Sequence, residues 1–204
     1  IERVVDQLSN NNKNEVINKY KGNNICIVCG STWEKDEKIL LKYIKESKNK
    51  NIKWIIAPHN ISKTNIDRIS KKLDAEFLIY SKINESNIHS NVLILDTIGD
   101  LKNIYSYSDL SYVGGGMGYS GLHNILEACV YKTPVIIGKN YSGFIEAEEL
   151  VELGGVVSVK DYDEFKIEFE NLINNKEAIK NKAKIISNYF NSKLGALSII
   201  QKEI

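Results

Sequence analysis

The sequence predicts an α/β fold with a doubly wound parallel sheet in a single domain; one observation gives the fold class, and a second gives the number of domains. First, short β-branched runs alternate with amphipathic stretches through residues 25–159, the order typical of parallel strands joined by helices. Second, 204 residues with 43% hydrophobic composition can bury a core without disulfides or a metal. We therefore expect a single domain over residues 1–204.

The strand candidates are short, β-branched runs bounded by turn-forming residues. In chain order they are ICIVCG (25–30), KWIIAP (53–58), EFLIYS (76–81), VLILD (92–96), LSYVGG (110–115), PVIIG (134–138) and GVVSV (155–159). Amphipathic spacing predicts helices at 34–47, 63–73, 121–131 and 144–153. From Tyr162 onward the pattern is helical only, so we expect terminal helices that either pack on the sheet or reach toward a partner.

Composition argues against several classes of function. The 27 basic and 26 acidic residues give a net charge of +1 and are spread along the chain, so no nucleic-acid footprint stands out. The apolar runs are far shorter than the roughly 20 residues of a membrane helix, and the N-terminus lacks a signal-peptide pattern. We expect this chain to be soluble.

The cysteines are expected to be structural. Cys26 and Cys29 have C-x-x-C spacing but lie inside an apolar strand candidate, without a second ligand pair or an exposed helix start. With Cys129 on a helix, the free thiols indicate a reducing cytosol.

Ligands of doubly wound sheets bind beyond the carboxyl ends of the strands. At the first such exit, CGSTWEKDE, Ser31 or Thr32 can cap the next helix, and ligand contact and a plain cap fit equally well. At the second, Pro58 stiffens the exit and His59 follows, with a functional and a surface histidine equally favoured. His89, in a polar loop, is expected at the surface.

The third exit is LDTIGDLKNIYSYSDLSYVGG. Asp96 and Thr97 close a strand, and Gly99 opens a helix that holds Leu101, Ile104 and Tyr105. Asp96 either caps that helix or binds a ligand hydroxyl, and both interpretations stay open.

The fourth exit, YVGGGMGYSGLHNILEACVYK, has the highest density of glycine. Residues 114–116 permit a close approach of a ligand to the backbone and positive φ angles. We expect a helix to start at Ser120 and Gly121, with an N-terminus that favours an anion such as phosphate. His123, Asn124 and Glu127 would share its polar face and suit a sugar. The alternative is an ordinary glycine-rich turn; Walker and dinucleotide-binding patterns do not fit.

The motifs GSTW, APH, DTIGDLKNIYSYSDLSYVGGG, GLHNILEA and PVIIGKNYSGFIEAEELVELGG together resemble the C-terminal half of 3-deoxy-D-manno-octulosonic acid (Kdo) transferases. These enzymes have the GT-B glycosyltransferase fold, whose C-terminal half is a Rossmann-like sheet. The likeness keeps order and spacing from about residue 3 to residue 159. It implies that this half binds the donor CMP-Kdo.

For the complete enzyme, the resemblance implies Kdo transfer to a lipid A precursor in lipopolysaccharide synthesis, at the cytoplasmic face of the bacterial inner membrane. The reaction would be inverting and would need no metal or cofactor. The residues implied to face the donor phosphate are Gly115, Gly116, Gly121, His123 and Asn124, with Glu127 reaching the ribose hydroxyls. The same crevice would be lined by Ser31, Thr32, Pro58, His59, Asp96, Thr97 and Gly99.

The chain departs from the family pattern in two ways. Many members read Pro-Arg-His where this sequence has Pro58 and His59, so we expect another cation, such as Lys63 or Lys139, to replace the arginine. The chain also starts near the end of the family's interdomain linker. The acceptor site, the general base and the membrane anchor are therefore expected on an N-terminal domain outside it, and these residues alone are expected to give no Kdo transfer.

Two other functions compete with this interpretation. A GT-B domain for another nucleotide sugar, such as a UDP-hexosamine, would share the glycine turn and the ribose glutamate. A non-catalytic interaction module would use its terminal helices on a partner. The acidic helix with Glu146, Glu148, Glu149 and Glu152 is expected to be a solvated face rather than a metal site, ended by a glycine cap at 154–155.

Overall fold

The computed structural model describes residues 4, 5, 8, 14–73, 75–83 and 88–203, and the side chains up to residue 194. Arg3, near which the resemblance begins, lies outside the described residues. The strands are β1 (Ile25–Thr32), β2 (Ile52–Pro58), β3 (Leu78–Ile79), β4 (Val92–Ile94), β5 (Leu110–Val113), β6 (Val135–Gly138) and β7 (Val156–Val159). The α-helices are α2 (Glu15–Lys21), α3 (Glu34–Glu46), α4 (Lys63–Leu73), α5 (Leu101–Ile104), α6 (Leu126–Cys129), α7 (Ile145–Glu152), α8 (Tyr162–Asn174) and α9 (Lys176–Glu203). Short 3₁₀ turns, η1 (Tyr80–Lys82) and η2 (Tyr105–Tyr107), follow β3 and α5.

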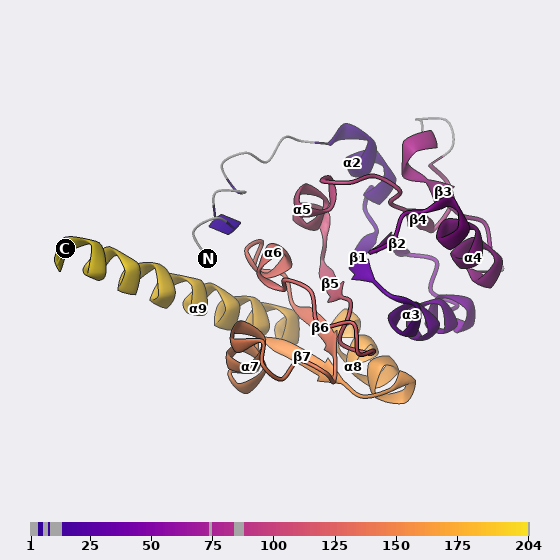
Figure 1. Ribbon diagram of the computed structural model, residues 1–204. Coiled ribbons are helices and arrows are strands. Elements are labelled where there is room, and N and C mark those ends of the chain that lie inside the picture. Colours follow the sequence, from indigo (N-terminus) through magenta and orange to yellow (C-terminus); the bar gives the residue numbers. More distant parts are fainter. Residues whose placement is uncertain (1–3, 6–7, 9–13, 74, 84–87, 204) are drawn as a thin grey trace.

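The strands form a seven-stranded sheet in the order β3-β4-β2-β1-β5-β6-β7, and every pairing is parallel (Figure 1). The predicted doubly wound α/β fold is therefore confirmed. The chain runs from β1 outward to one edge and then returns to place β5 on the other side of β1. The crevice between β1 and β5 is the topological switch point, where such sheets bind ligands.

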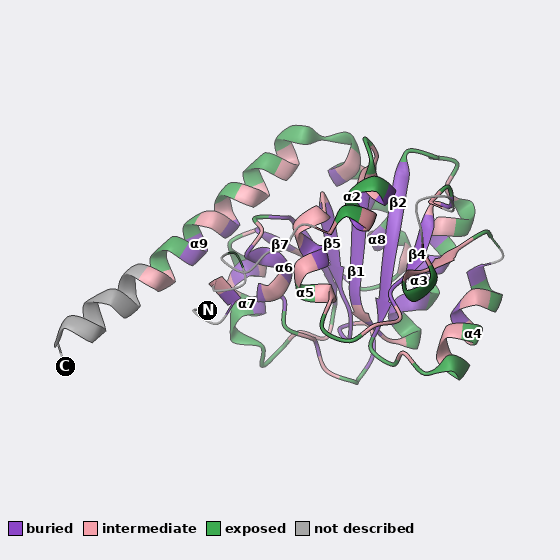
Figure 2. Cartoon of the chain, turned by 90° about the horizontal axis from the view of Figure 1, so that it is seen from above, coloured by how far each residue is buried: buried purple, intermediate pink, exposed green. Residues whose placement is uncertain are grey.

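Helices cover both faces of the sheet, and most strand residues between them are buried (Figure 2). On one face, Val28 and Ile55 pack with side chains from α2, α5, α6, α7 and α9. On the other, Ile27 and Trp54 pack with α3, α4 and α8. Neighbouring residues of each strand point to opposite faces, so strands covered on both sides are apolar throughout. This explains the continuous β-branched runs in the sequence.

The buried cysteines confirm the structural interpretation. Cys26, Cys29 and Cys129 are all fully buried and free. Burial raises the pKa of Cys26 to about 12, and it also raises the pKa of the other two thiols. Thiols in this environment are poor nucleophiles.

Both terminal helices pack on the sheet, the first of the two outcomes that the sequence left open. Helix α8 packs on the sheet through Phe165 and Phe169. The early turns of α9 bury Ile186 and Tyr189, and its later part extends away from the body (Figure 1). No described helix is both long enough and apolar enough to cross a membrane.

Helix α7 ends as predicted. Gly154 has a φ of +79°, and Gly155 donates its N–H to Leu150 O at 2.9 Å, the bond that closes a Schellman cap. Along the helix, Glu149 accepts from Tyr189 Oη at 2.5 Å and from Lys193 Nζ at 2.7 Å, which ties α7 to α9. Glu146, Glu148 and Glu152 are exposed, so the solvated-face prediction is confirmed for these three.

Two predicted elements are wrong in extent. The strand expected over 76–81 is reduced to Leu78–Ile79, because Ser81 turns to donate its N–H and hydroxyl to Asp96 at 2.8 and 2.6 Å. The helix expected over 121–131 is only Leu126–Cys129. Gly121 has a φ of +88°, and His123 donates its N–H to Gly114 O at 3.1 Å, so the backbone at 121–124 is not helical.

Candidate functional site

The site lies at the carboxyl ends of β1, β2 and β5, where backbone hydrogen bonds join three loops. His59 N–H donates to Thr32 O at 2.9 Å, and Gly114 N–H donates to Gly30 O at 2.9 Å. The β1 end carries a bulge at Ser31, which has a φ of +52°. Positive φ is uncommon outside glycine, and such strain concentrates at functional sites. The structure therefore places His59 beside Thr32, and Gly114 beside Ser31, where the three strands end.

The glycine loop is required by close backbone packing. Gly115 has a φ of +97°, and a Cβ added there would lie 2.0 Å from Gly121 O. A Cβ on Gly114 would lie 2.4 Å from Ser31 O, and one on Gly116 would lie 2.9 Å from Gly138 N. Larger residues cannot take these positions without moving the loop. The loop is thus built against β1, β6 and its own return segment.

A buried carboxylate, that of Asp36, holds the loop in place. Asp36 is 0% exposed, and its Oδ2 accepts from Gly115 N and Trp33 N, each at 2.9 Å. Its Oδ1 accepts from Tyr112 Oη at 2.8 Å and from Met117 N at 3.3 Å. Burial and the Asp36 carboxylate raise the pKa of Tyr112, so its hydroxyl stays protonated and donates. Asp36 therefore joins the start of α3 to the glycine loop.

This anchor changes which loop amides can meet a ligand. Because Gly115 N–H donates to Asp36, it is not free for the phosphate contact that the resemblance implied. Within the described chain, the N–H groups of Gly116, Gly121 and Asn124 donate to no other residue. Backbone N–H groups without a partner in the protein are donors of the kind that bind anions.

Three aromatic side chains meet beside this loop. The Trp33 indole stacks on His59, with ring centroids 4.3 Å apart, and its Nε1–H donates to His123 Nε2 at 3.0 Å. The rings of His59 and His123 lie 4.6 Å apart. Burial and the neighbouring His59 lower the pKa of His123. The structure thus brings together His59 and His123, both expected at the site, through Trp33, which was not.

Two polar residues lie at the start of α6: Asn124 precedes the helix, and Glu127 is in its first turn. Asn124 Oδ1 accepts from the N–H of Leu126, the first residue of the shortened helix, at 3.1 Å, while its amide donates to Glu127 Oε1 at 3.4 Å. Burial raises the pKa of Glu127, against the opposing effects of Asn124 and Lys102. A helix this short has little macrodipole, so the free loop amides are better placed than the helix end to attract an anion. A small hollow of about 40 Å³ lies between residues 122–126 and α7.

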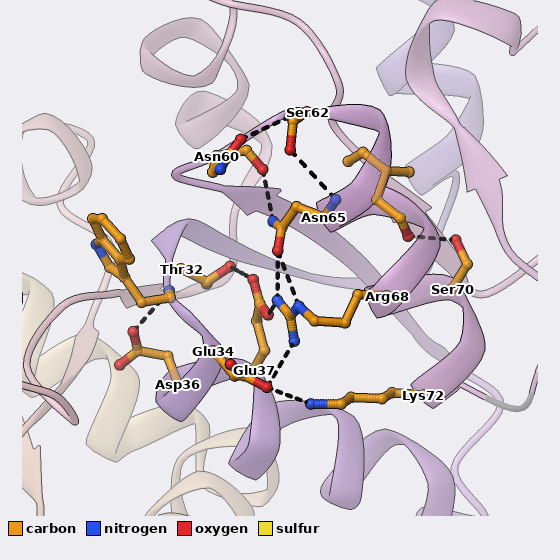
Figure 3. Close-up of polar contacts among 12 residues, drawn as sticks. Thr32, Glu34, Asp36, Glu37, Asn60, Ser62, Asn65, Arg68, Ser70 and Lys72 are labelled. Carbon is orange, nitrogen blue, oxygen red and sulfur yellow. Dashed lines mark hydrogen bonds and ion pairs between the residues drawn. The ribbon is translucent and has the colours of Figure 1, made fainter.

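The polar side chains between the end of β1 and the helices α3 and α4 are bonded to one another. Thr32 is buried and donates its hydroxyl to Glu37 Oε1 at 3.3 Å. Arg68 reaches from α4 to Glu37 and also donates its Nε to Asn65 Oδ1 at 3.0 Å (Figure 3). Burial raises the pKa of Glu37, and Arg68 opposes that rise. Arg68 is thus occupied between α3 and α4, and Thr32 meets Glu37 rather than the open crevice.

The residues of the third exit are bonded to one another or to the sheet edge. Asp96 is held by Ser81, and Thr97 Oγ1 donates to Asp100 Oδ2 at 2.5 Å. Gly99 is exposed with a φ of +92°, and α5 begins two residues later at Leu101. Asp96 therefore does not cap α5. Pro58 is buried at the end of β2.

Lys35 brings a cation to the glycine loop. Its Nζ lies 4.6 Å from the ring centroid of Tyr119, which is 93% exposed, and its stem runs beside Gly118. Within the described chain, its ammonium makes no ion pair. Lys63, at the start of α4, and Lys139, after β6, are exposed.

Sequence reasoning missed Trp33, Lys35 and Asp36, although all three lie in the GSTWEKDE stretch that it singled out. They had been treated as part of a capped helix start. No group of three or more His, Cys, Asp or Glu residues in the described ranges is arranged to hold a metal ion.

Comparison with known proteins finds similar glycosyltransferases. No family model matches the chain. A bifunctional glycosyltransferase/methyltransferase of Fusobacterium nucleatum is 30% identical over 187 residues, covering 89% of this chain and 28% of that protein. The 3-deoxy-D-manno-octulosonic acid transferase of Haemophilus influenzae is 31% identical and covers 74% of this chain; that of Aquifex aeolicus is 30% identical and covers 76%. The chain spans 36% and 43% of those two transferases.

Solved structures share the fold. The C-terminal CMP-Kdo binding domain of WaaA from Acinetobacter baumannii matches with a TM-score of 0.75 and 19% identity, covering 92% of this chain and 98% of that one. HepE from Anabaena, in complex with UDP, matches with a TM-score of 0.65 and 15% identity, over 94% of this chain and 52% of that one. These matches confirm the resemblance predicted from the motifs: the chain is related to the 3-deoxy-D-manno-octulosonic acid transferases and has the fold of their C-terminal GT-B domain.

Proposed function

We propose that this chain binds CMP-Kdo and that the whole protein transfers Kdo to a lipid A precursor in lipopolysaccharide synthesis. The observation that carries the proposal is the glycine loop at the β1–β5 switch point, with free amides at Gly116 and Gly121 and a carboxylate at Glu127. Relatives that are Kdo transferases, and the fold shared with a CMP-Kdo binding domain, support the choice of donor.

The donor contacts follow from its chemistry. CMP-Kdo carries a phosphodiester and a sugar carboxylate, and both are anions that suit backbone N–H groups and a lysine. The amides of Gly116, Gly121 and Asn124 would receive the phosphate, and Lys35 would take the role of the arginine missing after Pro58. Glu127 would accept hydrogen bonds from the ribose hydroxyls, with Ser31, His59 and His123 lining the crevice.

In the transfer step, an acceptor hydroxyl would attack the anomeric carbon of Kdo and lose its proton to the general base, while the bond to the CMP phosphate oxygen breaks. Negative charge then grows on the departing CMP phosphate. Fixed amides and a cation stabilise such a charge without a metal ion. We therefore propose an inverting, metal-independent reaction, with the general base and the acceptor site outside these 204 residues. The chain alone is expected to bind donor without transferring it, and transfer by the chain alone would contradict this part.

A thermal-shift experiment tests the proposal. A nucleotide at ten times its Kd stabilises the folded state by about 1.4 kcal/mol, or about 3 to 6 °C for a chain of this size. We expect CMP to raise Tm more than UDP or ADP, and Glu127→Ala to lose the rise. The matched control is Glu152→Ala, an exposed residue at the end of α7. Equal or larger shifts with UDP would favour a UDP-sugar domain, and no shift with any nucleotide would favour an interaction module.

A further inference from the structure

The contact between Trp33 and His123 fixes the chemical state of the histidine. An indole N–H can only donate, so a hydrogen bond of 3.0 Å from Trp33 Nε1 requires a lone pair on His123 Nε2. The imidazole proton must then lie on Nδ1, and the ring must be neutral. In free histidine this tautomer is the less common one. Here the hydrogen bond from Trp33 Nε1–H requires it.

The surroundings of His123 also favour the neutral ring. Burial and His59, which lies at the β2 exit, lower the pKa of His123, while Asp36 on α3 opposes them. His59 also stacks on the other end of the contact, with an interplanar angle of 20° to Trp33. The indole is therefore held by one histidine while it donates to the other.

The backbone around both residues is anchored. Trp33 N–H donates to Asp36, and His123 N–H donates to Gly114 O. The two residues are separated by 90 positions in the sequence, and their hydrogen bond spans the switch point from the β1 exit to the return segment of the glycine loop. The contact thus joins two fixed parts of the crevice.

We propose that Trp33 is a positioning residue that holds His123 as a neutral imidazole protonated on Nδ1, so that His123 offers the ligand one uncharged donor rather than a cation. The tautomer follows from the contact itself. Only the identity of the group that accepts from Nδ1–H rests on the proposed function. Under that function, the acceptor is an oxygen of the nucleotide sugar.

The test is a long-range ¹H–¹⁵N spectrum of the ¹⁵N-histidine-labelled chain between pH 5 and 8. The chain has three histidines, so His59→Asn and His89→Asn suffice to assign them. We expect wild-type His123 to be neutral and protonated on Nδ1 at pH 7. In Trp33→Phe, which keeps an aromatic ring but loses the N–H, we expect the Nε2–H tautomer and a higher pKa. Trp54→Phe is the matched control, because Trp54 is buried against Phe169 in the core.

A CMP titration supplies the second readout. We expect Trp33→Phe to weaken CMP binding about fivefold at pH 7 and to make it pH-dependent, with Trp54→Phe unchanged. A wild-type His123 that is charged or protonated on Nε2 at pH 7 would overturn the proposal, as would an unchanged tautomer in Trp33→Phe. If wild-type chain binds no CMP, the proposed function fails, and the spectrum still decides the role of Trp33.

Discussion

Replacing Asp36 by asparagine tests the idea that one buried carboxylate holds the glycine loop. Asp36 accepts from Trp33 N, Gly115 N, Met117 N and Tyr112 Oη. In the variant, the new amide would face Tyr112, whose hydroxyl can reverse to accept from it, and Met117 N would lose its acceptor. The other bonds would lose the charge of the carboxylate.

The magnitude follows from those bonds. A hydrogen bond to a charged group contributes about 1.5–3 kcal/mol, and a neutral one about 0.5–1.5 kcal/mol. Losing one bond and weakening the others gives a loss of about 3 to 6 kcal/mol, a large part of the roughly 5–15 kcal/mol that keeps a protein folded. Urea denaturation measures this change as a lower midpoint.

Two further variants serve as comparisons for Asp36→Asn. Tyr112→Phe removes a single donor and should cost less than Asp36→Asn. Asp67→Asn makes the same chemical change at an exposed position of α4 and should stay within about 0.5 kcal/mol of wild type. If Asp36→Asn costs less than about 1 kcal/mol, the carboxylate does not hold the loop as described.

Further outcomes are expected elsewhere in the chain. Gly115→Ala should destabilise the protein by about 2 kcal/mol or more, measured in urea, and abolish CMP binding, since its φ is +97° and its Cβ would meet Gly121 O; unchanged binding would contradict the loop geometry. The raised pKa of Glu127 means that its contribution to stability is present below its ordinary value of 4.5 and is lost as the pH rises through the raised value. Glu127→Gln should therefore be more stable than wild type at pH 7 while it binds CMP more weakly, and a less stable variant would show the sign to be wrong. Lys35→Gln should weaken CMP binding about fivefold and reduce its salt dependence, whereas Lys38→Gln, an exposed change on the same helix, should not. Iodoacetamide at pH 8 should modify Cys26 far more slowly in native protein than in urea, because burial raises its pKa to about 12; equal rates would contradict its burial.

The sheet was predictable from the sequence, and so was the position of the candidate site relative to it, because both follow from local patterns. Runs such as 25–30 and 134–138 are apolar throughout, as strands covered on both faces must be, and their alternation with helices leads to a parallel sheet. Glycine density at 114–116 predicted positive φ angles and a close approach by a ligand; the structure shows a positive φ at Gly115, and the close approach it shows is to the backbone of Ser31 and Gly138.

The start of the helix expected over 121–131 could not be predicted, because it depends on a contact that the sequence pattern does not show. Leu122, Ile125, Leu126 and Cys129 have helical spacing, yet the return of His123 to Gly114 keeps the first part out of the helix. A loop that buries one leucine beside a short helix gives the same apolar pattern as a longer helix. The spacing could not separate the two.

The hydrogen-bond partners of Asp36 and Trp33 could not be predicted from the sequence either. Asp36 has the sequence position of an ordinary acidic residue in a first helical turn, but its carboxylate points to a loop that is 79 residues away. Trp33 meets His123 only because β1 and β5 are neighbours in the sheet. Once the strand order was known, the polar residues at those two exits could have been paired.

The central claim is that the glycine loop at the switch point binds CMP. A ¹H–¹⁵N correlation spectrum of the labelled chain, titrated in parallel with CMP and UDP, tests it most directly. We expect CMP to shift the amide signals of Gly116, Gly121, Asn124 and Glu127 and to bind more tightly than UDP. Shifts confined to other surfaces, such as the hollow between Tyr43 and Tyr162, or tighter binding of UDP, would contradict it.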